Sequence, residues 1–166
     1  MHFLDLLRKQ VAILDGATGT MIQSLDLTAK DFGGADYQMC SDLLCFSRPR
    51  LMRDIHLEFL RAGAHAVETN TFGASPFRLS EYNFKALDTA GFEGLPPGVD
   101  IREASHAEIA YQLGRKGAEI AREALELHRA DADYDGRPLY VVGSIGPSNR
   151  VVSSSRADLA TATFDE

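Results

Sequence analysis

Acidic and small polar residues directly follow three short apolar runs of the sequence, and these are the residues whose types could do chemistry. If the runs are strands of a parallel sheet, their carboxyl ends meet at one edge, where α/β folds bind ligands. Two carboxylates beside free backbone N–H groups could hold the ammonium and the carboxylate of an amino acid. The third run leads into a glycine-rich segment, 143–149. The candidate site residues are therefore Asp15, Gly16, Glu68, Thr69 and Asn70, together with the segment 143–149.

Structural roles stay open for both acidic residues. Asp15 precedes Gly16 and could serve only as a turn former. Glu68 could serve only to bond neighbouring strand ends. General acid–base chemistry would need a suitably placed partner, and none of the five histidines stands at a useful position. We therefore assign no catalytic residue from the sequence.

Three predicted strands must position these residues. Residues 11–14 are four apolar residues without polar alternation, which is typical of a strand buried on both faces. Residues 65–68 and 139–142 give the second and third strands. Two long helices, predicted over 47–63 and 105–128, separate the strands. This β-α-β-α-β order predicts a right-handed parallel sheet.

Capping residues mark both long helices. Ser47 can cap the first helix, Pro49 suits its first turn, and Gly63 can end it. Ser105 and Glu108 have the spacing of a capping box at the start of the second helix. The apolar residues of both helices recur at helical spacing, so we interpret them as core.

Shorter segments complete the pattern. Residues 3–9 are predicted as an amphipathic helix that could cap the bottom of the sheet, residues 21–25 as a helical turn, and residues 75–85 as a further helix. Residues 28–46 are irregular, and a loop of that length is more often a functional lid than filler. Residues 86–101 carry three glycines and two adjacent prolines, which predicts a surface loop.

The strand ends indicate the fold class. Each predicted strand ends in a polar, glycine-rich segment, which is the arrangement of a (β/α) barrel. The prediction is therefore an α/β fold with about three β/α units of such a barrel, and a doubly wound sheet is the alternative. A complete barrel takes roughly 250 residues, whereas this chain has 166.

Length, charge and cysteine content limit the function classes. The length is typical of one domain, and the net charge of −7 disfavours nucleic acid and anionic membranes as partners. No apolar run approaches the roughly 20 residues that span a bilayer, and the N-terminus lacks a secretory pattern. Two cysteines do not make a disulfide scaffold, so the cytoplasm is the expected location.

Metal and nucleotide motifs are poorly represented. No two histidines stand at i, i+4, and Cys40 and Cys45, five positions apart in a predicted loop, lack the further downstream ligands of a zinc site. The glycine turn at 16–19 lacks the Gly-Lys-Ser/Thr end of a phosphate loop and the pattern of a dinucleotide site. His56 lies near the apolar face of its helix and is interpreted as packing. We assign no metal ligand in this chain.

Several ordered motifs resemble the homocysteine-binding domain of cobalamin-dependent methionine synthases, within the zinc homocysteine S-methyltransferase family. The segments that carry the resemblance are 14–23 (LDGATGTMIQ), 41–44 (SDLL), 48–56, 62–64 (AGA), 68–74 (ETNTFGA) and 146–149 (GPSN). It runs from about residue 11 to the end and is interrupted by the loop 86–101. Betaine-dependent and other zinc homocysteine methyltransferases share the fold, but the long first motif and the motif 68–74 favour the cobalamin-dependent branch.

The resemblance implies a role for each predicted site residue. The chain would be the N-terminal part of a homocysteine-binding (β/α)8 barrel, with residues 1–166 forming a partial domain that lacks the later strands. Asp15, with the backbone of Gly16 and Ala17, would bind the amino-acid end of homocysteine, which adds Ala17 to the predicted substrate-binding residues. The polar residues 68–70 would line the pocket.

The resemblance also implies cofactors and partners. In the family, zinc held by three cysteines converts the homocysteine thiol to a thiolate. The thiolate takes a methyl group from methylcobalamin, which is recharged from methyltetrahydrofolate on another domain. The implied partners are thus homocysteine and the cobalamin and folate modules of a longer polypeptide. The family's cysteine ligands are absent from this sequence, so we expect the chain alone neither to bind zinc tightly nor to transfer methyl groups.

Other functions stay open at this point. The chain could be a fragment of a betaine- or S-methylmethionine-type homocysteine methyltransferase. It could also be a non-catalytic, truncated module that pairs with a complementary chain supplying the remaining strands. An unrelated barrel enzyme that acts on a small anionic substrate is a further alternative.

Overall fold

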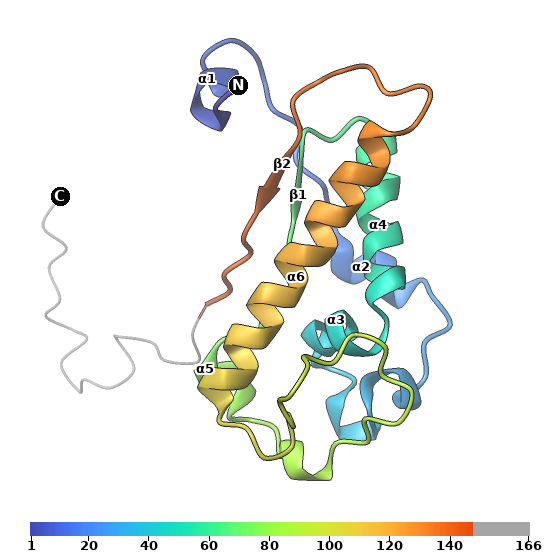
Figure 1. Ribbon diagram of the computed structural model, residues 1–166, viewed down its shortest axis with the longest axis vertical. Helices are drawn as coiled ribbons and strands as arrows, with labels where there is room; N and C mark the ends of the chain where they lie inside the picture. Colours follow the sequence, from blue (N-terminus) through green and yellow to red (C-terminus); the bar gives the residue numbers. More distant parts are fainter. Residues whose placement is uncertain (148–166) are drawn as a thin grey trace, which may run out of the picture.

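A small parallel sheet and two long helices form the centre of the structure (Figure 1). The structure is a computed structural model of the chain and describes residues 1–147. Strands β1 (Ala66–Glu68) and β2 (Tyr140–Val142) pair in parallel, with Val67 opposite Val141. The α/β class and the parallel sheet are confirmed, whereas the number of barrel units stays a prediction.

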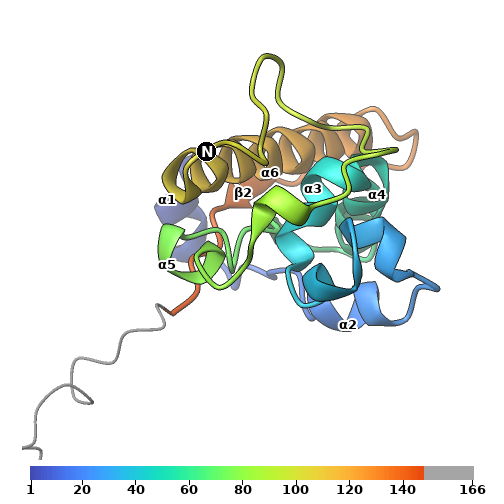
Figure 2. The ribbon, with the colours of Figure 1, turned by 90° about the horizontal axis from the view of Figure 1, so that it is seen from below.

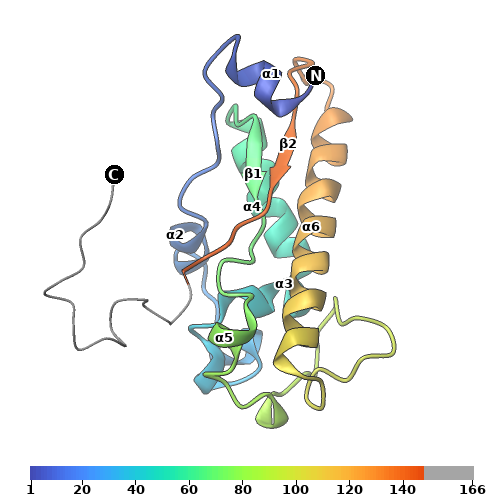
Figure 3. The same ribbon diagram turned by 90° about the vertical axis from the view of Figure 1, so that its left-hand side faces the viewer.

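The first predicted strand, 11–14, is not a regular strand. Within the described residues its one bridge is parallel and joins Leu14 to Ala66, so β1 lies between this segment and β2 (Figure 3). Val11 is 84% exposed and Ile13 is 54% exposed, so the prediction that the run is buried on both faces is wrong. A strand of that kind needs a neighbour on each side and a layer on each face, and the described structure places only β1 beside this run.

Helices α4 (Pro49–Arg61) and α6 (His106–Arg129) lie side by side over one face of the sheet (Figures 1 and 2). Their apolar stripes face each other and the sheet, which confirms the prediction that both stripes are core. The buried residues of this layer include Met52, Leu60, Val67, Ile109, Leu113, Ala121 and Ala124.

The two long helices begin differently. The Ser105 hydroxyl accepts a hydrogen bond from the Glu108 N–H at 3.2 Å, so Ser105 caps α6 as predicted. The reciprocal half of the predicted capping box does not form, because the Glu108 carboxylate accepts from Gln112 instead. The prediction that Ser47 caps α4 is wrong, because Ser47 ends the short helix α3 (Leu44–Ser47) and Arg48 precedes α4. The Ser47 hydroxyl is buried and has no hydrogen-bond partner within residues 1–147.

Residues 28–46 form part of the core and not a lid, contrary to expectation. Short helical turns fold this segment against α4 and the start of α6. The turns before α3 are η1 (Ala29–Phe32), η2 (Ala35–Tyr37) and η3 (Ser41–Leu43). Its buried residues are Phe32, Tyr37, Cys40, Asp42, Leu43, Leu44, Cys45 and Phe46. Turns of three or four residues are too short to repeat an apolar face, which is why the sequence shows no periodic pattern here.

Two short helices lie at opposite ends of the strands. Helix α1 (Phe3–Leu7) lies at the amino end of β2, where the Phe3 and Tyr140 rings meet edge to face at 4.9 Å (Figure 3). This contact confirms the prediction of a helix that caps the bottom of the sheet. Helix α2 (Thr18–Gln23) begins within the glycine turn 16–19, at the carboxyl end of the strands, and replaces the predicted turn at 21–25.

The connection from β1 to α6 is mostly irregular. The predicted helix 75–85 is only a single turn, α5 (Pro76–Leu79), followed by η4 (Phe84–Ala86). Residues 86–101 contain no strand or long helix, as predicted, although Leu87 and Ile101 near the ends of this loop are buried. None of the helices in the described part of the chain is long and apolar enough to cross a membrane.

Gly117 allows α6 to approach the end of β1. A Cβ at this position would lie 2.6 Å from Thr71 Cγ2, whereas a Cβ at Gly114 on the same helix would meet no atom within 4 Å. We expect Gly117→Ala to lower the free energy of unfolding by about 1–3 kcal/mol. We expect Gly114→Ala to raise it by up to about 1 kcal/mol, because alanine favours the helix. Urea unfolding measures both values, and equal stabilities of the two variants would contradict the close approach.

His56 is buried in α4, and neither of its ring nitrogens has a hydrogen-bond partner in residues 1–147. Its 1% exposure confirms the interpretation of this residue as packing. Burial lowers the pKa of His56 from 6.5 to about 4, because the charged ring would lose its water. Between these two values the unfolded chain binds a proton that the folded chain does not bind. His56 therefore destabilises the fold progressively as the pH falls from 6.5 to 4.

We expect His56→Leu to gain stability relative to the wild-type chain over this interval, reaching up to about 3 kcal/mol near pH 4. Urea unfolding of both chains between pH 4 and pH 7.5 measures the difference at each pH. His2→Leu, which removes an exposed histidine, is the matched control. A stability difference that does not change with pH would show that burial does not hold the His56 ring neutral.

Candidate functional site

A cavity of about 430 Å³ lies at the carboxyl end of β1 and contains all six predicted site residues. It lies beside the glycine turn after residue 15 and the segment that follows β2. The lining residues are Asp15, Gly16, Ala17, Thr18, Gly19, Ser41, Glu68, Thr69, Asn70, Phe72 and Ser144. The prediction that these residues lie together at one edge of the sheet is confirmed, and their role in binding stays a prediction.

Asp15 is held over the end of β1. Its Oδ2 accepts a hydrogen bond from the Glu68 N–H at 2.9 Å. The pKa of Asp15 is raised from 3.8 to about 6. Burial is the largest cause, the hydrogen bond from the Glu68 N–H partly opposes it, and the nearby Glu68 carboxylate adds to the rise. A cation bound beside Asp15 would therefore be neutralised by a carboxylate that is otherwise costly to ionise.

Glu68 provides the second carboxylate of the cavity. Its side chain is exposed, and its Oε2 accepts a hydrogen bond from the Ser144 hydroxyl at 3.2 Å. This bond joins the end of β1 to the segment after β2. The charge of Glu68 is one cause of the raised pKa of Asp15, so the two carboxylates interact across the cavity that both line.

The glycine turn presents backbone donors on the same cavity. Within the described residues, the N–H groups of Gly16 and Ala17 donate no hydrogen bond. Thr18 Oγ1 donates to the Gly16 carbonyl at 3.3 Å, which holds the turn closed. Free N–H groups beside two carboxylates match the carboxylate and the ammonium of an α-amino acid.

Thr69 supports the cavity wall through hydrogen bonds within the protein. Its Oγ1 accepts the Ser144 N–H at 3.0 Å, and Thr71 Oγ1 donates to the Ser144 carbonyl at 2.9 Å. The two threonine hydroxyls are 2.6 Å apart. Since Thr71 gives its proton to the carbonyl, Thr69 donates to Thr71, and both hydroxyls are used.

Asn70 also serves the wall of the cavity. Its Nδ2 donates to the Ser41 carbonyl at 2.7 Å, and its backbone carbonyl accepts from Cys45 Sγ at 3.4 Å. Asn70 is 8% exposed. The amide therefore ties the end of β1 to the short turns of 28–46 and has little surface left for a ligand.

The sequence prediction missed part of the lining. Ser41 lines the cavity because the fold of residues 28–46 brings it there, and no local sequence pattern predicts this position. Phe72 belongs to the motif 68–74 but was not predicted in the site; it is 62% exposed, which is unusual for a phenylalanine. Ser144 lies in the predicted segment 143–149, of which residues 148 and 149 fall outside the described part of the chain.

The two cysteines do not fit a zinc site. Cys40 is 2% exposed and Cys45 is fully buried, and burial raises the pKa of each thiol to about 12, with a further contribution from Asp42. Zinc binds the thiolate form, which is strongly disfavoured at both positions. In the described part of the chain, no group of three or more His, Cys, Asp or Glu residues could hold a metal ion.

Comparisons with known proteins agree with the sequence resemblance. The sequence profile of the family described as Homocysteine S-methyltransferase matches residues 12–166. The chain is 34% identical over 158 residues to the methionine synthase of Mycobacterium tuberculosis, which covers 95% of this chain and 11% of that protein.

Solved structures give the same result. The crystal structure of the homocysteine methyltransferase MmuM from Escherichia coli in its oxidized form matches 86% of this chain and 39% of MmuM, with a TM-score of 0.59 and 29% identity. The metallated form matches 86% of this chain and 40% of MmuM, with a TM-score of 0.58 and 28% identity. The chain thus spans less than half the length of these relatives, which are methyltransferases by name. The family profile covers nearly the whole chain, and the chain therefore belongs to the homocysteine S-methyltransferase family.

Proposed function

We propose that this chain supplies the part of a homocysteine pocket that binds the amino-acid end of the substrate, within a methyltransferase that forms methionine. The observation that supports this most directly is the arrangement of Asp15 and Glu68 beside the free N–H groups of the glycine turn. The family assignment makes homocysteine the natural ligand for this arrangement.

In the proposed complex, the ammonium of homocysteine lies between the carboxylates of Asp15 and Glu68. Its carboxylate accepts hydrogen bonds from the N–H groups of Gly16 and Ala17. The arriving ammonium favours the ionised form of Asp15 and so lowers its raised pKa. Thr69 and Asn70 act as wall residues that hold the neighbouring segments.

The metal and the methyl donor belong to the proposal for the longer protein. We propose zinc and methylcobalamin on the resemblance of the motifs 14–23 and 68–74 to the cobalamin-dependent branch. A betaine- or S-methylmethionine-type donor is the alternative within the same family. Cys40 and Cys45 do not fit zinc, so we derive no step through a metal here and expect the chain alone not to transfer methyl groups. The buried free thiols fit the cytoplasmic location expected from the sequence.

A second candidate function is a non-catalytic module that pairs with a complementary chain. The exposed apolar side chains of Val11, Ile13 and Leu14 support it, because a partner could cover them. The domain assignment of 1–166 as a partial barrel is common to both candidates.

Binding of L-homocysteine to the purified, monomeric chain tests the pocket. We expect titration calorimetry to detect binding that strengthens as the pH rises to about 6 and then levels off, since Asp15 must ionise. We expect 4-mercaptobutyrate, which lacks the amino group, to bind about tenfold to a hundredfold more weakly. Equal binding of the two ligands, or no binding by a folded monomer, would contradict the proposal.

Asp15→Asn separates binding from stability. Because the folded chain keeps the carboxyl protonated up to about pH 6, Asp15 lowers stability as the pH rises from 3.8 to 6. We expect Asp15→Asn to be more stable than the wild-type chain above pH 7, by about 1–2 kcal/mol after allowing for partial exposure, and to bind homocysteine more weakly. Asp26→Asn, at an exposed position, is the control. A loss of stability in Asp15→Asn at pH 7.5 would contradict the role of burial.

A further inference from the structure

The segment that carries Asp15 is attached to β1 by a short parallel ladder. Ala66 donates its N–H to the Ile13 carbonyl at 3.2 Å, and Asp15 donates its N–H to the Ala66 carbonyl at 2.9 Å. In a regular parallel ladder the next bond would run from the Ile13 N–H to the Ala64 carbonyl. The ladder does not continue in this way.

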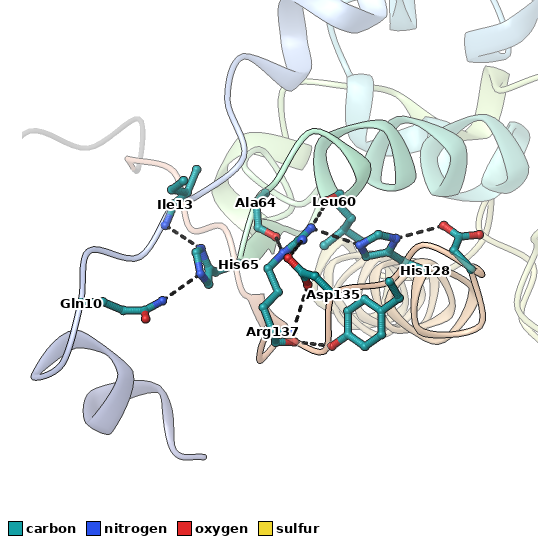
Figure 4. Close-up of polar contacts among 10 residues, drawn as sticks. Gln10, Ile13, Leu60, Ala64, His65, His128, Asp135 and Arg137 are labelled. Carbon is teal, nitrogen blue, oxygen red and sulfur yellow. Dashed lines mark hydrogen bonds and ion pairs between the residues drawn. The ribbon is translucent and has the colours of Figure 1, made fainter.

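Two side chains take the place of that missing bond (Figure 4). The Ile13 N–H donates to His65 Nδ1 at 3.2 Å, and Arg137 Nε donates to the Ala64 carbonyl at 3.2 Å. Arg137 also donates to the Leu60 carbonyl and lies 3.1 Å from His128 Nε2. Arg137 therefore fastens the end of α4, whereas the His65 side chain binds the Ile13 N–H. The His65 backbone N–H also donates to the Ile13 carbonyl, at 2.7 Å.

The contact with Ile13 selects one form of the His65 ring. A nitrogen that accepts an N–H carries no proton, so the neutral ring carries its proton on Nε2. Gln10 lies 3.1 Å from Nε2, and its amide pairs with this tautomer when the carbonyl oxygen faces the ring. Either form with a proton on Nδ1 would place two donors against each other. The ring is 9% exposed, so water replaces these partners poorly.

We propose that His65 is a positioning residue for Asp15: its neutral ring, through Nδ1, fixes the segment 10–13 in the register that places the Asp15 carboxylate over the Glu68 N–H. The placement of Asp15 stands on the contacts of the ladder, and its benefit for substrate binding rests on the proposed function. A shift of one residue would turn the Asp15 side chain to the other face of the sheet. The segment has only one bridge, between Leu14 and Ala66, and the Ile13 carbonyl is shared by the N–H groups of two successive residues, His65 and Ala66. The backbone bonds therefore specify the register less sharply than a regular ladder does, and the contact of the Ile13 N–H with His65 Nδ1 completes it.

Two substitutions of His65 distinguish positioning from general packing. Asn Oδ1 stands the same number of bonds from Cα as His Nδ1, so His65→Asn keeps the acceptor for the Ile13 N–H, whereas His65→Leu removes it. Hydrogen exchange of the Ile13 amide and NMR titration of the Asp15 carboxyl are read in both variants and in the control His2→Leu. The ¹⁵N shifts of the His65 ring report the tautomer in the unmodified chain.

We expect the unmodified ring to carry its proton on Nε2. In His65→Leu we expect the Ile13 amide to exchange about tenfold faster or more, the Asp15 titration to fall from about 6 toward 3.8, and homocysteine binding to weaken. His65→Asn retains all three properties.

A proton on Nδ1, or identical behaviour of the Asn and Leu variants, overturns the proposal, and the tautomer measurement decides even if His65→Leu does not fold. If the amide and titration results hold but the unmodified chain does not bind homocysteine, the proposed function fails and the placement of Asp15 by His65 stands.

Discussion

The pairing of β1 on both of its edges is the constraint on which the rest of the structure depends. Three residues, Ala66–Glu68, hold the segment before Asp15 on one side and β2 on the other. Their carboxyl end carries Glu68, whose N–H binds Asp15 and whose side chain binds Ser144. Each acidic group of the cavity is thus positioned through this strand, and the long helices contribute by holding it from one face.

A second set of contacts fixes the end of β1 against the short turns of 28–46. Asp42 accepts the Gly73 N–H at 2.9 Å, and a Cβ at Gly73 would lie 2.5 Å from Asp42 Oδ2. The glycine in the motif 68–74 is therefore required by a buried carboxylate that approaches its backbone. Together with the bond from Asn70 to Ser41, this contact makes the turns a second wall of the cavity.

The parts of the fold that the sequence predicted well are those with local causes. Both long helices, the Ser105 cap and the polar strand ends follow from spacing and turn chemistry, and the six site residues do meet in one cavity. The roles of Thr69 and Asn70 could not be predicted, because their hydrogen bonds go to residues far along the chain. The prediction for Ser47 is wrong because the short helix α3 ends at Ser47, so Arg48 and not Ser47 stands at the position before α4. The run 11–14 has the composition of a buried strand, but burial depends on neighbours that local sequence does not specify.

Asp15 and His56 also have a joint effect on how the chain exchanges protons with the solvent. Between about pH 4 and pH 6, unfolding releases a proton from the carboxyl of Asp15 and adds one to the ring of His56. The two exchanges are opposite in sign and nearly equal in number. For these two groups taken together, folding in mild acid moves one proton from an imidazole to a carboxyl and draws none from the solvent. In the pH dependence of the stability of the unmodified chain, the contribution of Asp15 is therefore offset by that of His56, and each emerges when the other group is replaced.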